Sequence, residues 1–309
     1  MSKVSICCMT YNQELYIKDA INGFLCQKTD FDYEIIIHDD CSTDNTEKIV
    51  KEYQEKYPKL IKAILQKENQ YSKGKNILNF CLAEASGEYI AICEGDDFWT
   101  DEYKLQKQID ILDANPQYSC CMHNVEWLNC QTNISNKVEI YGTDRVIDTK
   151  QFLTGDRFPY NTCSLVIRKD LIQKMPDWVY ACPVGDIPMQ LYATMKGEMY
   201  FMKDYMATYR CMAINSWSVV QKQDAKLYYG IKSTLETAKT FSNENEAFDY
   251  RIGYENLIIA GITSDKKLFK ESVTKATFKQ LPLKMRIKFW LKTYMPKTAN
   301  VLRRVWKQG

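Results

Sequence analysis

Three groups of polar residues in the first third of the chain could bind an anionic ligand, directly or through a metal ion. The groups are Thr10, Tyr11 and Asn12, then Asp39 and Asp40, and then Glu94, Asp96 and Asp97. Carboxylates as near in sequence as those of the third group repel each other by up to about 4 kcal/mol per close pair at an effective dielectric constant near 20. A cation removes this repulsion. Oxygen ligands suit Mg²⁺ or Mn²⁺, which usually completes its shell with water and substrate phosphates.

Each group follows a run of residues that has the pattern of a buried β-strand. Such runs span residues 4–9, 33–38, 60–65 and 88–93, and helical patterns at 15–27, 44–57 and 77–85 separate them. The alternation predicts βαβ units and a parallel sheet, with Ser42 or Asp44 as the cap of the second helix. Because open α/β sheets bind ligands at the carboxyl ends of their strands, the three groups are expected on one rim. Aspartate and asparagine are also common turn residues, so each group alone has a purely structural interpretation.

The rest of the chain indicates more strands and then helices. A helix is predicted at 101–112, the apolar runs at 118–127 and 163–167 indicate strands, and long helical patterns begin near Lys222. No GxGxxG and no GxxxxGK[ST] sequence occurs, so neither a dinucleotide fingerprint nor a P-loop is present. Phosphates must then be held by a metal ion and by side chains. Lys75, beside Gly74, could supply positive charge, or it could belong to a solvated basic loop.

Composition limits the class of protein. With 45% apolar and 26% charged residues, the 309-residue chain has a globular profile. No apolar run approaches the roughly 20 residues that cross a bilayer, and no signal peptide is visible, so a cytoplasmic protein is expected. The twelve cysteines are scattered and are expected to be reduced. With only two histidines, any metal should sit on carboxylates.

The C-terminal end is strongly basic. From Ser272 to Gly309 there are ten lysines and arginines and no acidic residue, which leaves 31 basic against 39 acidic residues, a net charge of −8, in the rest of the chain. One helical face carries Leu283, Ile287, Trp290, Leu291 and Tyr294. Lysines flank this face, which is typical of a helix at a membrane interface, and residues 283–309 could hold the protein at the cytoplasmic face of the inner membrane. The alternative is a helix packed on the catalytic domain with a solvated basic side. Nucleic acid is not the expected partner, because the predicted crevice is acidic.

Three motifs resemble those of glycosyltransferase family 2, which has the GT-A fold. Residues 4–12 resemble its opening strand and TYN turn, residues 39–44 (DDCSTD) its DDxSxD segment, and residues 87–99 (GEYIAICEGDDFW) its GEYIxxxDxDD strand and metal motif. The resemblance implies a Rossmann-like, mostly parallel sheet flanked by helices. It also implies a catalytic domain over 1–221, with a nucleotide-binding half at 1–115 and an acceptor half at 116–221. A helical region would follow at 222–309.

The resemblance implies an activity and roles for single residues. One sugar would pass, with inversion, from a nucleotide-sugar donor, expected to be a UDP-sugar, to a saccharide or lipid-linked saccharide acceptor in surface polysaccharide or glycoconjugate synthesis. Tyr11 and Asp40 would contact the base, and Asp96 and Asp97 the ribose, diphosphate and Mn²⁺ or Mg²⁺ ion. Glu94 stands where the family usually has aspartate. Asp186, in the sequence VGDIP, matches the catalytic carboxylate and would be the general base, unless it only caps the helix that follows.

The sequence departs from the family pattern at one further position. Met212 follows the pair Tyr209 and Arg210 where the family often has a histidine that helps to hold the metal ion, and a thioether is a poor ligand for Mg²⁺. Trp217 matches an aromatic residue that often ends this segment. No QxxRW sequence occurs, which favours transfer of a single sugar. Two other functions stay open: a nucleotide-sugar-binding protein with weak or no transferase activity, and a sugar nucleotidyltransferase.

Overall fold

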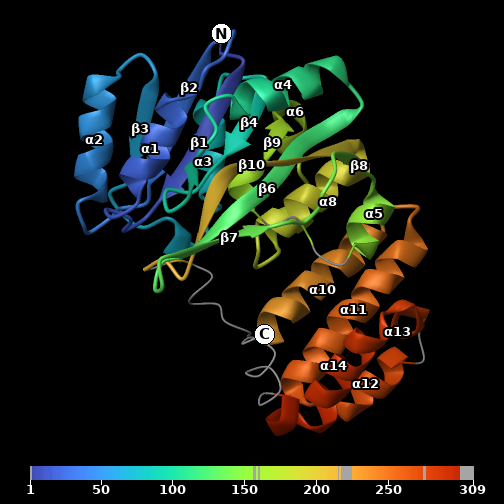
Figure 1. Ribbon diagram of the computed structural model, residues 1–309. Helices are drawn as coiled ribbons and strands as arrows, with labels where there is room; N and C mark the ends of the chain where they lie inside the picture. Colours follow the sequence, from blue (N-terminus) through green and yellow to red (C-terminus); the bar gives the residue numbers. More distant parts are fainter. Residues whose placement is uncertain are drawn as a thin grey trace. The chain divides into compact units, whose positions relative to one another are not determined.

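The computed structural model describes residues 2–155, 158, 161–214, 216, 225–273 and 276–299 (Figure 1). Trp217 and the end of the basic tail lie outside these residues. Contacts divide the chain into two compact units of three segments each. Unit 1 comprises Met1–Asp148, Pro159–Met175 and Tyr192–Val220, and unit 2 comprises Thr149–Phe158, Pro176–Leu191 and Gln221–Gly309. The helical C-terminal region thus shares a unit with two segments from the middle of the chain.

The first part of unit 1 is a parallel α/β arrangement. Its strands are β1 (Val4–Thr10), β2 (Tyr33–Asp39), β3 (Ile61–Leu65) and β4 (Tyr89–Ile92), and they pair in parallel in the order β3-β2-β1-β4. The helices between them are α1 (Ile17–Leu25), α2 (Thr46–Lys56) and α3 (Leu78–Glu84). The predicted βαβ units are confirmed. Buried aliphatic side chains of the strands pack on the apolar face of α1, because every second strand residue points to the same side of the sheet.

The second part of unit 1 extends the same sheet with antiparallel pairings. The strand β9 (Val166–Arg168) runs antiparallel between β4 and β6 (Tyr118–Asn129). The long strand β10 (Glu198–Cys211) lies parallel to β6 and antiparallel to β5 (Phe98–Trp99), the strand that follows the acidic run. Shorter elements complete the unit: β7 (Ile134–Val138), β8 (Arg145–Ile147), α4 (Lys104–Ala114), α6 (Lys169–Ile172), and the 3-10 turns Tyr71–Lys73 and Thr162–Ser164. Pairing with β5 brings the end of β10 to the acidic run.

Unit 2 is helical. Its elements are α5 (Thr149–Thr154), α7 (Asp177–Tyr180), the start of α8 (Asp186–Lys196), α10 (Ala225–Lys239), α11 (Asn245–Thr263), α12 (Lys266–Val273), α13 (Ala276–Gln280) and α14 (Leu283–Tyr294). Helix α11 is the centre of this group, because it contacts α5, α10, α12, α13 and α14. The helices predicted after Lys222 are confirmed. Among the described residues, no helix is both long enough and apolar enough to cross a bilayer.

Candidate functional site

The turn after β1 is held by the turn after β2. The N–H of Asn12 donates to Ser42 Oγ at 2.9 Å, and its Oδ1 accepts from the N–H of Thr43 at 2.7 Å. Asn12 has a left-handed backbone with φ of 52°, which asparagine tolerates well. Thr10 is buried and donates from Oγ1 to Gln13 Oε1 at 2.8 Å, whereas Tyr11 is 41% exposed. Of these three predicted ligand-binding residues, Tyr11 offers the most surface to a nucleotide, and the other two shape the turn.

Asp39 holds its own turn. It is completely buried, and its carboxylate accepts hydrogen bonds from the N–H of Ser42 at 3.0 Å and from the Ser42 hydroxyl at 2.5 Å. Burial raises the pKa of this carboxyl group. Because its hydroxyl group is bonded to Asp39, Ser42 does not cap α2. Asp44 binds the first N–H of that helix instead, since its Oδ1 accepts from the N–H of Thr46 at 2.9 Å. Asp39 contributes to the rim through the turn it fixes, because its side chain has no exposed surface.

Asp40 ties the next loop to the rim. Its two carboxylate oxygens accept from the N–H groups of Gln70, at 2.8 Å, and Tyr71, at 3.0 Å, and only 3% of the residue is exposed. Each oxygen keeps a lone pair for a further donor. The loop leads through Gly74, with φ of 74°, to the exposed Lys75. Asp40 thus positions the loop that carries this lysine.

The acidic run lies directly against the turn after β1. The N–H of Gly95 donates to the carbonyl oxygen of Met9 at 2.9 Å, and a Cβ atom at this glycine would lie 2.6 Å from Gln13 Oε1 and 2.8 Å from Thr10 Oγ1. Since real Cβ contacts are not this short, only glycine permits this approach. The N–H of Asp40 donates to the carbonyl oxygen of Thr10 at 3.0 Å. The structure therefore brings the three predicted groups together, as expected from the strand ends.

The carboxylates of the run differ in their surroundings. Glu94 and Asp96 are partly exposed, and Asp96 is hydrogen-bonded to the side chain of Gln13. Asp97 is 2% exposed, and its Oδ1 accepts from the N–H of Arg210 at 2.8 Å. A hydrogen bond joins its carboxyl group to the thiol of Cys163. Burial raises the pKa of Asp96, and it raises that of Asp97 well above its usual range, with further contributions from Asp96 and Glu94.

Arg210 clamps the acidic run, a role that the sequence reasoning did not assign. Its Nη1 donates to the carbonyl oxygen of Asp96 at 2.9 Å, and its Nη2 forms an ion pair with Asp19 of α1. The guanidinium carbon lies 4.4 Å from the ring centroid of Phe98 and 5.1 Å from that of Tyr16. The pair Tyr209 and Arg210 was visible in the sequence as a motif, but its partners are distant in the chain. Backbone and side chain of one residue thus fix both aspartates.

The side chains of the run fit a hard cation with few protein ligands. Among the described residues, no three His, Cys, Asp or Glu side chains form a ready metal site. Mg²⁺ usually takes only one or two protein carboxylates and fills its shell with water and phosphate oxygens. Because Asp97 is buried and already bonded to the backbone, Asp96 and Glu94 are the carboxylates with surface available for a cation. Met212, directly after β10, has φ of 61° and offers only a thioether.

Asp186 belongs to unit 2, where it starts α8. Its Oδ1 accepts from the N–H of Ile187 at 2.8 Å, which satisfies one of the N–H groups in the first helical turn that have no acceptor within the helix. Burial raises the pKa of Asp186 to about 6, and no cationic group counters this effect. A carboxylate with a pKa near the working pH is suited to accept a proton from a hydroxyl group.

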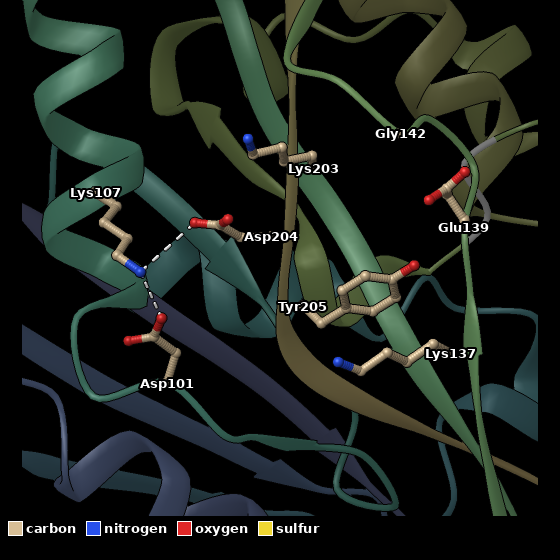
Figure 2. Close-up of a pocket in the computed structure, with 8 residues that line it drawn as sticks. All are labelled: Asp101, Lys107, Lys137, Glu139, Gly142, Lys203, Asp204 and Tyr205. Carbon is tan, nitrogen blue, oxygen red and sulfur yellow. Dashed lines mark hydrogen bonds and ion pairs between the residues drawn. The ribbon is translucent and has the colours of Figure 1, made fainter.

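Two hollows open on unit 1. The larger, of about 510 Å³, is lined by equal numbers of lysines and acidic residues, which come from β10, from β7 and the loop after it, and from α4 and the loop before it (Figure 2). Lys107 pairs there with Asp101 at 2.6 Å and with Asp204 at 3.6 Å. None of the predicted site residues lines it. The smaller hollow, of about 270 Å³, includes Asn12, Thr43 and Ile214, so it adjoins the turn after β1.

The sequence matches known proteins along most of its length. The family model described as glycosyl transferase family 2 matches residues 5–173. The uncharacterized protein Rv1520 of Mycobacterium tuberculosis is 33% identical over 243 residues, which cover 75% of this chain and 67% of that protein.

Solved structures show a similar fold. TarS 1-349 of S. aureus in complex with UDP-GlcNAc aligns with a TM-score of 0.59 at 17% identity, over 94% of this chain and 79% of TarS 1-349. The mannosyltransferase PcManGT of Pyrobaculum calidifontis, in complex with GDP-Man and Mn²⁺, aligns with a TM-score of 0.57 at 15% identity, over 100% of this chain and 88% of that one. At these identities the likeness concerns the fold, which is the GT-A glycosyltransferase fold.

Proposed function

Since this chain belongs to glycosyltransferase family 2, we propose that it moves one sugar from a UDP-sugar to a saccharide or lipid-linked saccharide, with inversion at the anomeric carbon. The observation that carries the proposal is the meeting of the turn after β1 with the acidic run, held by Gly95 and Arg210. This arrangement places an exposed aromatic ring, Tyr11, and partly exposed carboxylates on one rim. Such a rim suits a nucleoside diphosphate: the ring offers a surface for the base, and the carboxylates offer ligands for a cation.

The donor's charge is neutralised by groups on this rim. Mn²⁺ or Mg²⁺, when bound, supplies Lewis-acid stabilisation of the leaving diphosphate. Asp96 and Glu94 would hold the cation. Asp97 would keep the acidic run in place, because its Oδ1 already accepts from the N–H of Arg210. The exposed Lys75 would approach the phosphates from the loop that Asp40 fixes. PcManGT, whose fold is similar, was solved with GDP-Man and Mn²⁺, which supports a divalent cation in this chain too.

Asp186 would act as the general base. In an inverting transfer a carboxylate takes the proton of the acceptor hydroxyl group while the oxygen of that hydroxyl group attacks the anomeric carbon. Its pKa of about 6 leaves it ionised at neutral pH yet basic enough for this step. The acceptor would belong to surface polysaccharide or glycoconjugate synthesis at the cytoplasmic face of the inner membrane. The relative TarS of Staphylococcus aureus is named a poly(ribitol-phosphate) β-N-acetylglucosaminyltransferase, which supports a polymer as the acceptor.

Two experiments test the proposal. Thermal unfolding of the full chain with Mn²⁺ and a panel of uridine, guanosine and thymidine diphosphate sugars should show stabilisation by one donor, with UDP-sugars favoured. No shift with any of them would overturn the donor assignment. With the donor identified, Asp186→Asn should abolish transfer while leaving metal-dependent donor binding within twofold of wild type. Asp177→Asn, at the start of the neighbouring helix α7, is the matched control and should transfer normally.

A second candidate is a nucleotide-sugar-binding protein without turnover. Met212 in the position of the expected histidine and Glu94 in place of aspartate favour it. Its signature would be Mn²⁺-dependent donor binding that is equal in wild type and Asp186→Asn, with no product from either. A sugar nucleotidyltransferase is disfavoured by the family to which the chain belongs and by the lack of a Gly-rich basic loop after β1.

A further inference from the structure

Helix α14 carries apolar side chains on two different faces. One face packs within unit 2: Phe289 and Thr293 are buried, and the ring of Phe289 meets that of Tyr254 of α11 edge-on, with 5.5 Å between centroids. The other face presents Leu283, Ile287 and Trp290 to solvent, with 70%, 46% and 45% of their surface exposed. Their spacing of four and then three residues puts them in one row along the helix. The inner face therefore anchors α14, and the outer row stays exposed, although the ring of Trp290 stacks on that of Tyr294 of the same helix, with 5.6 Å between centroids.

The outer row differs from the face predicted from the sequence. That prediction also included Leu291 and Tyr294, which are half-buried in the structure. Tyr294 meets Phe269 of α12 edge-on, at 5.5 Å between centroids, and so belongs partly to the core of unit 2. Three strongly exposed apolar residues in a single row are more than the scattered surface leucines and isoleucines of an ordinary protein.

The surroundings of this row are basic. Lys284 and Lys288 are exposed and lie along one side of it, and Lys266 of α12 reaches over the ring of Tyr294, with its Nζ 5.6 Å from the centroid. The segment from Ser272 to Gly309 has ten basic residues and no acidic one. A symmetric pair of chains would bring this row against its own copy, because a twofold interface uses the same patch on both subunits. Like charges would then oppose the contact.

We propose that the outer row of α14, Leu283, Ile287 and Trp290, inserts into the interface of an anionic lipid bilayer, with Lys284 and Lys288 at the level of the headgroups. Amphipathic helices bind membranes in this way, through buried apolar area together with attraction to anionic lipid, and tryptophan is favoured at that depth. The proposal does not depend on the transferase activity. A lipid-linked acceptor would, however, be concentrated on the same surface.

Co-sedimentation of the full chain with vesicles tests the proposal. Wild type should bind vesicles of phosphatidylcholine with 30% phosphatidylglycerol at least tenfold more tightly than vesicles of phosphatidylcholine alone. Ile287→Asn/Trp290→Ala and Lys284→Gln/Lys288→Gln should each bind the anionic vesicles at least tenfold more weakly than wild type. All four side chains are exposed, so circular dichroism should be unchanged, and loss of the contact between the rings of Trp290 and Tyr294 should lower the melting temperature only slightly.

Matched controls separate this surface from general effects. Phe241→Asn removes another exposed apolar side chain of unit 2, 68% exposed, and Lys48→Gln/Lys59→Gln removes the same charge from exposed positions of unit 1. Both should bind like wild type. The proposal is overturned if wild type does not bind anionic vesicles, if the α14 variants bind as well as wild type, or if the controls lose as much. A dimer in solution that Ile287→Asn/Trp290→Ala dissociates would likewise overturn it and assign the row to a second copy.

Discussion

Arg210 gives the sharpest test of how the acidic run is held. Lysine at this position keeps the positive charge but has no planar fork, so it cannot reach both the carbonyl oxygen of Asp96 and the carboxylate of Asp19. The bond to Asp96 is shielded and charge-assisted, and such bonds contribute about 1.5–3 kcal/mol. The ion pair counts for less, at most about 1 kcal/mol, because the side chain of Asp19 is 52% exposed.

From these contributions we expect Arg210→Lys to destabilise unit 1 by about 2 kcal/mol. At about 2–4 °C per kcal/mol for a domain of this size, the melting temperature should fall by about 4–8 °C. If all of this free energy served to position Asp96 for the cation, Mn²⁺ affinity in the presence of nucleotide would fall at most about thirtyfold, since about 1.4 kcal/mol is a factor of ten. A loss of about five- to thirtyfold by calorimetric titration is the expected result.

Arg168→Lys is the matched control. The guanidinium of Arg168 is also embedded in unit 1, where it donates to the carbonyl oxygens of Tyr118 at 2.8 Å and Leu112 at 2.6 Å. Arg168 pairs with Tyr89 at the start of β4, whereas the acidic run follows the other end of that strand. Arg168→Lys should lower the melting temperature as much as Arg210→Lys does, and it should leave the Mn²⁺ affinity within twofold of wild type. If Arg210→Lys behaves in the same way as this control, Arg210 is only a structural residue and the reasoning about the run is wrong.

Four further predictions concern the acidic run, the base Asp186 and position 212. Gly95→Ala should lower the free energy of unfolding by about 1–3 kcal/mol, measured by chemical denaturation, because the new Cβ atom would press on Gln13 and Thr10. Gly185→Ala is the control and should be neutral, because a Cβ atom there would have nothing within 4 Å. Equal effects of the two substitutions would contradict the close approach at Gly95. The rate of transfer should fall as pH drops through about 6, following protonation of Asp186. A carboxyl group whose pKa is raised on folding makes the folded state less stable as the pH rises from about 4 to 6. Asp186→Asn should therefore stabilise the protein at pH 7 by up to about 3 kcal/mol. No change in stability would indicate that Asp186 only caps α8 and is not a desolvated base. Met212→His should lower the Mn²⁺ concentration needed for half-maximal donor binding, since imidazole is the better ligand, and an unchanged titration would exclude position 212 from the metal shell.

The strands and helices near the N-terminus were predictable because their signals are local. Apolar runs bounded by turn residues predicted β1 to β4, and helical periodicity predicted α1 to α3. The carboxyl ends of parallel strands necessarily lie on one rim of the sheet. The identity of the family followed from motifs within that stretch. What the carboxylates of those motifs do was less visible. The carboxylate oxygens of Asp39 and Asp40 accept hydrogen bonds that stabilise turns, because the N–H groups of Ser42, Gln70 and Tyr71 need acceptors.

The tertiary structure decided the contacts between residues far apart in the chain. Arg210 reaches Asp19 and the acidic run only because β10 pairs with β5, and no periodicity reports such a pairing. The segments 149–158 and 176–191 join the helical unit through contacts of the same kind. On α14 the sequence determined a helix with apolar and basic residues. Packing of Phe289 and Thr293 decided which apolar residues stayed outside, because a helix that packs on one side leaves the side chains of its other faces in solvent.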